Sequence, residues 1–130
     1  MPRKISKRNL ESVKQQVREY DVTLTRIIPR DIAHGSDVVG EEIFFLLYNR
    51  ETLEKDFQRF GTAGELVLLW RRVQELDSLL LSQREAMVDA FHRDYYRSER
   101  ERLKMPREYW WWYLDESEPA KWQSVPRADG

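Results

Sequence analysis

Apolar side chains recur at steps of three and four along three separate stretches of the chain. This spacing places them on one face of an α-helix, so the pattern predicts helices at roughly 8–20, 38–60 and 62–104. Charged and polar residues occupy the opposite faces. The sequence therefore predicts an all-α fold: a helical hairpin or small bundle with one very long helix and an aromatic C-terminal segment.

The third stretch is the longest one without an interruption. From Glu65 to Met105 the chain contains no glycine or proline, and Pro106 then ends the pattern. Thr62 and Glu65 match a capping box, which predicts where this helix begins. An unbroken helix would be about 65 Å long at roughly 1.5 Å per residue, longer than a domain of this size is wide. One very long helix and a tightly bent pair both fit the pattern.

The segment between the first two predicted helices has a different character. Residues 21–28 are rich in β-branched side chains, which favour extended backbone, and Pro29 disfavours helix in the residue before it. A single strand would have no partner here, so we expect a linker or a helix end. Ser36 or Asp37 would then cap the second helix, and Gly61 would end it.

Length and composition fit a single domain. The chain of 130 residues can build one core but not two independent domains with a cleft between them. We divide it into a basic N-terminal arm at 1–8, a single helical domain at 9–114 and a flexible acidic tail at 115–130. Within the domain, the second and third helices, joined at 60–62, would form the central antiparallel hairpin.

The composition also bears on assembly and location. A hydrophobic share of 41% with a charged share of 35% is typical of helices that expose one face, so we expect a homo-oligomer that covers leftover apolar surface. The absence of cysteine excludes a disulfide scaffold, thiol catalysis and cysteine-ligated zinc, and it favours the cytoplasm. The longest apolar cluster, Ile43 to Tyr48, is too short to span a bilayer, so we expect no membrane partner.

The most unusual local feature is a run of five aromatic residues after Pro106. Rings at five consecutive positions cannot all face one core in a regular helix or strand, so part of this surface is expected to meet a partner. Tryptophan and tyrosine are enriched at interface hot spots. We therefore interpret the run, with nearby arginines, as a docking surface for a protein partner or a second copy. The residues of this predicted surface are Tyr109, Trp110, Trp111, Trp112, Tyr113, Arg97, Arg100 and Arg102.

An alternative interpretation of the aromatic run needs no partner. The segment would fold back on the chain's own helices, and Arg97 or Arg100 would cover the rings that point outward. Self-packing of this kind and docking of a second protein both fit the sequence.

Nucleic-acid binding is a second function that the sequence allows. Arg3, Lys4, Lys7 and Arg8 form a basic arm that could neutralise phosphates, and the arginines between 97 and 107 could extend it. The net charge of −1 and the acidic second helix argue against this function, because dedicated nucleic-acid binders of this size are usually basic.

Metal binding is a third function to consider. Asp31 precedes His34 by three residues, and Asp89 precedes His92 by the same distance, which on a helix would put each pair on one face. Helical bundles bind two metals through similar motifs. Those motifs normally use glutamate, however, and the glycine and proline around the first pair make a helix there doubtful.

Enzymatic motifs are not found in the sequence. No nucleophile elbow surrounds a serine, and no glycine-rich loop could hold a phosphate. We therefore expect a protein that is not an enzyme, with no catalytic residues and no cofactor. The function that the sequence favours is that of an accessory or adaptor subunit.

Overall fold

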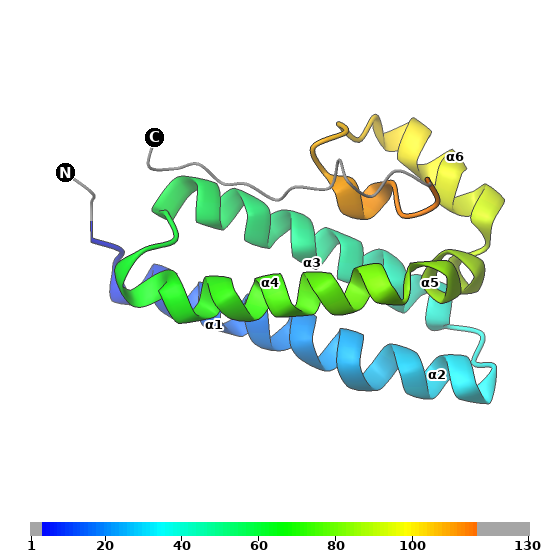
Figure 1. The fold of residues 1–130 in the computed structure, drawn as a ribbon, viewed down its shortest axis with the longest axis horizontal. Coiled ribbons are helices and arrows are strands. Elements are labelled where there is room, and N and C mark those ends of the chain that lie inside the picture. The colour runs from blue at the N-terminus through cyan, green and yellow to red at the C-terminus, as the bar shows by residue number, and fades with distance from the viewer. Residues whose placement is uncertain (1–3, 117–130) are drawn as a thin grey trace.

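Helices joined by short turns make up the chain in the computed structural model, which describes residues 4–116 (Figure 1). No strand occurs within this range. The predicted all-α class is therefore confirmed for the part of the chain that the structure describes. None of the helices in this part has the length and hydrophobicity needed to cross a bilayer.

The first helical arm is much longer than the sequence pattern predicts. α1 (Lys7–Val22), the π-helical turn η1 (Thr23–Ile27) and α2 (Ile28–His34) follow one another without a break over 28 residues. The prediction of a linker or helix end at 21–28 is wrong. Pro29 lies in the first turn of α2, where its missing N–H is tolerated, directly after the wider π-turn.

Two further helices complete a three-helix bundle with this arm. α3 (Val39–Phe60) runs back along α1, and α4 (Val67–Ser82) follows after the 3-10 turn η2 (Gly64–Leu66) (Figure 1). Gly61, with a φ of 90°, ends α3 as predicted. The predicted hairpin of α3 and α4 is present, and the rings of Phe57 and Trp70 meet between these helices with their centroids 4.9 Å apart.

The capping box that the sequence predicts at Thr62 does not form. No side chain caps η2 or α4, and Gly64 adopts a left-handed φ of 62°. A residue in this conformation cannot continue a right-handed helix, so the box lacks the regular backbone it requires. The α-helix therefore begins only at Val67.

The long helix predicted at 62–104 is bent rather than continuous. α4 is followed by α5 (Arg84–Phe91) and α6 (Arg93–Leu103), with breaks at Gln83 and His92. His92 has a φ of 76°, which interrupts the helix sharply. The bends return α5 and α6 over one end of α3, where their apolar side chains are buried (Figure 1). A straight helix would have carried those side chains into solvent.

The core draws side chains from all these helices. Its members on α1 to α6 and η1 include Val13, Val17, Tyr20, Leu24, Ile28, Ile43, Leu46, Leu47, Leu53, Phe57, Trp70, Val73, Leu76, Leu80, Met87, Val88, Phe91 and Tyr96. Most of them lie on the stripes that the helical spacing marks in the sequence.

Candidate interaction surfaces

The aromatic run completes the core of the chain itself. Trp110, Trp111 and Trp112 form the 3-10 turn η3 and are 2%, 0% and 0% exposed. Tyr109 and Tyr113 beside them are partly buried. The sequence-based argument that part of this surface must meet a partner is wrong for the three tryptophans. The alternative in which the segment folds back on its own helices is what the structure has.

The tight 3-10 turn explains how consecutive rings can all be buried. With about three residues per turn, successive side chains point in different directions and meet different helices. The ring of Trp112 lies 5.9 Å from Phe44 on α3 and stacks at 5.8 Å on Tyr96 of α6. Trp111 instead faces the guanidinium of Arg50, 4.6 Å from its ring centre. The segment is wedged between helices rather than laid on one.

A buried ion network lies beneath these rings. Arg50 is fully buried and donates two hydrogen bonds to the Asp77 carboxylate, at 2.8 and 2.9 Å, and one to Glu54 at 3.0 Å. The Tyr20 hydroxyl donates to Asp77 at 2.7 Å. Burial alone would lower the pKa of Arg50, but the Asp77 carboxylate raises it to well above its ordinary value. Burial and the same carboxylate raise the pKa of Tyr20.

This network is closed to solvent, so its charged groups cannot reach a ligand in the structure. The sequence gives little sign of it, since only the spacing of Arg50 and Glu54 on one helix is visible there. Asp77 joins them from another helix, and only the tertiary fold brings it close. Paired and hydrogen-bonded in this way, the buried charges tie α1, α3 and α4 together.

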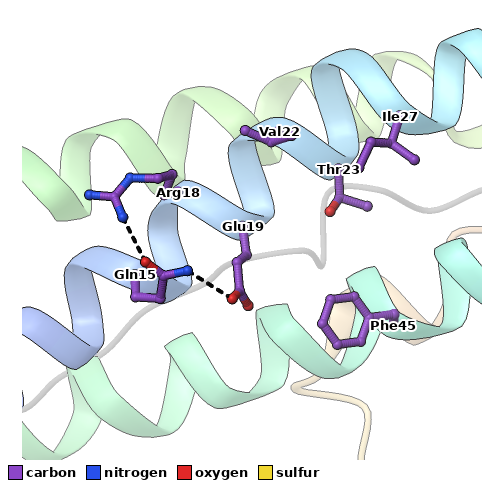
Figure 2. A pocket seen from close by; sticks show the side chains of 7 residues that line it. All are labelled: Gln15, Arg18, Glu19, Val22, Thr23, Ile27 and Phe45. Carbon is purple, nitrogen blue, oxygen red and sulfur yellow. Dashed lines mark hydrogen bonds between the residues drawn. The ribbon is translucent and has the colours of Figure 1, made fainter.

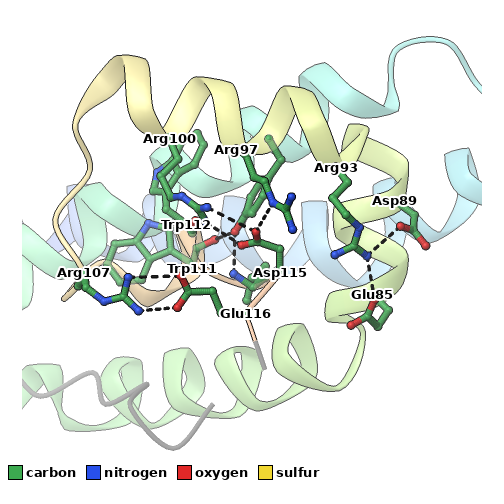
Figure 3. Close-up of polar contacts among 12 residues, drawn as sticks. Glu85, Asp89, Arg93, Arg97, Arg100, Arg107, Trp111, Trp112, Asp115 and Glu116 are labelled. Carbon is green, nitrogen blue, oxygen red and sulfur yellow. Dashed lines mark hydrogen bonds and ion pairs between the residues drawn. The ribbon is translucent and has the colours of Figure 1, made fainter. Parts of the chain in front are cut away.

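Arginines of α6 hold the aromatic segment in place (Figure 3). Arg97 and Arg100 donate to the Asp115 carboxylate at 2.9 and 2.6 Å, and Arg100 also donates to the Trp112 carbonyl at 2.9 Å. Arg107 pairs with Glu116 in the same region. We call these contacts the arginine clasp. The structure thus places Asp115 and Glu116 against the helices rather than in a tail, and the rest of the predicted flexible tail lies outside the described residues.

The arginine clasp lowers the pKa of Asp115 and pairs Arg97 and Arg100 with its carboxylate. Burial raises the pKa of Asp115, but hydrogen bonds from Arg100 and Arg97 lower it by more, so the net pKa lies below its ordinary value. Arg102, also predicted at this surface, pairs instead with Glu99 on its own helix at 2.6 Å. The three arginines are therefore near the aromatic run or on its helix, as predicted, but their charges are already satisfied.

The cations of the basic arm, in contrast to the arginines of the clasp, are not paired with carboxylates in the described part of the chain. Lys4, Lys7 and Arg8 are exposed, and Arg3 lies outside the described residues. Within 4–116, none of these three makes an ion pair, and the same holds for Arg18 on α1 and Arg26 on η1. Arg18 donates only to the Gln15 amide oxygen, at 2.6 Å. The positive charge of this helix is thus largely free to meet another molecule.

A hollow lies beside this helix, between α1 with η1 and α3 (Figure 2). Its volume is about 400 Å³. Val22, Thr23 and Ile27 form one wall, and the ring of Phe45 forms the other. Phe45 is 53% exposed although it is a large apolar residue in the middle of a helix. Phe45 therefore exposes apolar surface at the edge of a concavity.

Sequence reasoning missed this hollow, although a signal for it exists. Phe45 lies off the helical stripe formed by Ile43, Leu46 and Leu47, so its ring had to point away from the core. What the sequence could not show is that Val22 and Ile27 lie opposite, because a linker was predicted at that point.

The aspartate and histidine pairs do not come together as metal sites. Asp31 accepts a hydrogen bond from Arg30, and His34 contacts the Arg30 carbonyl through Nδ1 at 2.8 Å. Asp89 pairs with Arg93, while His92 breaks the helix that was meant to align the second pair. In residues 4–116 there is no group of three or more side chains suited to a metal ion.

Comparison of the chain with known protein families, curated proteins and solved structures finds no match. Its function therefore has to be inferred from its own residues.

Proposed function

We propose that the chain is a non-enzymatic interaction protein, an accessory or adaptor subunit, which receives an amphipathic helix of a protein partner in the hollow between α1–η1 and α3. One observation carries the proposal: the half-exposed ring of Phe45 stands beside a hollow of about 400 Å³ whose exposed surface is mostly apolar, although Gln15, Arg18 and Glu19 also line it. Burying such a ring and the facing side chains is favourable by roughly 25 cal/mol per Å² of apolar surface.

The shape of the site favours a helix as the occupant. α1 and α3 run in opposite directions side by side, and the channel between two such helices accepts the side chains of a third. Binding of an amphipathic helix in an apolar groove is a common mode of peptide recognition, with anchors three and four residues apart. An added helix would extend the three-helix bundle to four.

The buried network supports a role without catalysis. The pKa values of Arg50 and Tyr20 are raised well above their ordinary values, but burial beneath the aromatic run keeps both groups and their partner Asp77 away from any substrate. Such a network serves to fix the arrangement of helices. The hollow beside Phe45, in contrast, is open to solvent, which suits binding.

A helical peptide library displayed on phage tests this proposal with the full chain as the immobilised target. We expect peptides of about 18 residues with apolar anchors at helical spacing to be enriched. Enrichment should be lost on the Phe45→Ser variant and kept on Leu68→Ser, which removes an exposed apolar side chain from α4 instead. Circular dichroism would confirm that both variants are folded. Equal recovery on wild type and Phe45→Ser would contradict the proposal.

Nucleic-acid binding remains a second candidate, because Lys4, Lys7 and Arg8 make no ion pair in the described chain. The arginines between 97 and 107 do not strengthen it, since three of the four are paired with carboxylates at the clasp and the fourth with Glu99. Phosphate-driven binding should weaken steeply with salt and should not depend on Phe45.

A further inference from the structure

We infer that the partner helix is acidic, with its carboxylates on the one flank of its apolar stripe that faces α1. This inference rests on the proposed docking of a helix in the hollow. It adds the chemical class of the partner helix and the rotation of that helix about its own axis.

The first support is the position of two arginines around the hollow. Arg18 lines it, one helical turn before Val22, and Arg26 follows Val22 by about one turn on the same continuous helix. Arg18 therefore lies at one end of the apolar wall, and Arg26, which does not line the hollow, is exposed on the same helix one turn beyond Val22. Carboxylates on a docked helix can form bidentate hydrogen bonds with both arginines, the geometry that a guanidinium favours.

The second support is an asymmetry in how the charges of this helix are used. Of its carboxylates, Glu11 is in an ion pair with Lys14 and Asp21 with Arg72, whereas Glu19, which lines the hollow, accepts a hydrogen bond from the neutral Gln15 amide. By contrast, four cations of this helix, and Lys4 just before it, have no ion-pair partner within residues 4–116. These cations are Lys4, Lys7, Arg8, Arg18 and Arg26. Along this wall the cations without an ion pair, Arg18 and Arg26, outnumber the one such carboxylate, Glu19, so the unpaired charge is positive on balance.

The opposite wall explains why the acids are expected on one flank only. On α3, the exposed residue one turn before Phe45 is Glu41, and no cation lines the hollow from that side. A helix with carboxylates on both flanks would bring like charges together at α3. Complementary charges on one side and repulsion on the other fix the rotation of the docked helix.

Other anionic partners fit this surface less well. Nucleic acid would use the free cations but not the apolar hollow between them, and Glu41 on the opposite helix would repel its phosphates. A lipid surface is met by a convex amphipathic face, whereas Phe45 borders a concavity. An acidic helix uses the cations and the hollow together.

The sequences and affinities of the selected peptides test the inference. We expect them to carry Asp or Glu along one flank of the apolar stripe. The Arg18→Gln/Arg26→Gln double variant should weaken their binding about tenfold at low salt, and this difference should shrink as ionic strength rises. Arg71→Gln, which removes an exposed arginine of α4, is the matched control and should have little effect.

Each other outcome has a distinct meaning. Peptides that need Phe45 but carry no excess of acids, and that bind the double variant equally well, would overturn the acidic partner while leaving the proposed docking intact. Recovery that does not depend on Phe45 would overturn the docking itself. Tight binding of single-stranded RNA that depends on Arg18 and Arg26, and that the acidic peptides do not displace, would show instead that the cations serve nucleic acid.

Discussion

The aromatic C-terminal segment and the basic N-terminal helix show opposite relations between a sequence feature and its exposure. Trp110 to Trp112 are the most unusual residues of the chain, yet they are buried, and the arginines beside them are paired with Asp115. The N-terminal helix is ordinary in composition, yet this helix and Lys4 before it hold five cations with no ion-pair partner among residues 4–116, and Phe45 beside it is half-exposed. The difference teaches that an unusual sequence cluster can serve to stabilise the fold. The side chains available for binding are instead the exposed cations without an ion pair and the exposed ring of Phe45.

The largest expected effect concerns the aromatic segment as part of the core. Trp112→Ala should lower the free energy of unfolding by about 3–5 kcal/mol, because it removes a buried ring that packs on Phe44 and Tyr96. Urea unfolding followed by circular dichroism measures this. If the loss were no larger than that of Phe45→Ala, expected to be within about 0.5 kcal/mol, the contrast between the two regions would be lost.

A similar loss of stability is expected when the buried ion network beneath the aromatic segment is broken. Asp77→Ala removes the main partner of Arg50 and leaves a buried guanidinium with too little negative charge around it, which should cost about 3–5 kcal/mol of stability. The same unfolding experiment applies. Replacing Arg50 by Met in addition should restore part of the loss, and the absence of any restoration would mean that the unpaired charge is not its cause.

The truncation of one leucine tests which face of α4 is buried. Leu76 is 1% exposed, so Leu76→Ala should cost on the order of 2–5 kcal/mol. Leu68→Ala on the same helix, at an exposed position, is the control and should stay within about 0.5 kcal/mol. A loss below half a kcal/mol at Leu76 would contradict the burial of this face.

The clasp should have a smaller and pH-dependent effect. Asp115→Asn should cost about 1 kcal/mol at neutral pH, because it weakens the hydrogen bonds from Arg97 and Arg100. The folded pKa of Asp115 lies below its ordinary value of 3.8, so its contribution is present above 3.8 and is lost as the pH falls through the lower folded pKa. Unfolding midpoints of wild type and variant should therefore converge in acid. A constant difference across that range would exclude ionisation of Asp115 as the cause.

The homo-oligomer that the composition predicts stays a prediction, and it bears on the N-terminal region. Light scattering with in-line size exclusion on wild type and on Phe45→Ser measures it. We expect any oligomer of wild type to lose mass in the variant, because the exposed ring rather than the buried tryptophans is available for contact. A monomer at every concentration tested would contradict the prediction, and an oligomer insensitive to the substitution would place the contact elsewhere.

The sequence by itself determined the all-helical class, the hairpin of α3 and α4 and the position of Gly61, because these depend on local periodicity and on the conformational freedom of one glycine.

Only the tertiary structure decided where the long third stretch bends, how the helix continues through Pro29, and which partner each charge finds. The backbone bends at His92 because doing so buries side chains against α3, and Arg50 meets Asp77 only after two helices pack. Burial and charge pairing join residues that are distant in sequence, and for that reason local pattern could not tell the buried tryptophans from the exposed phenylalanine.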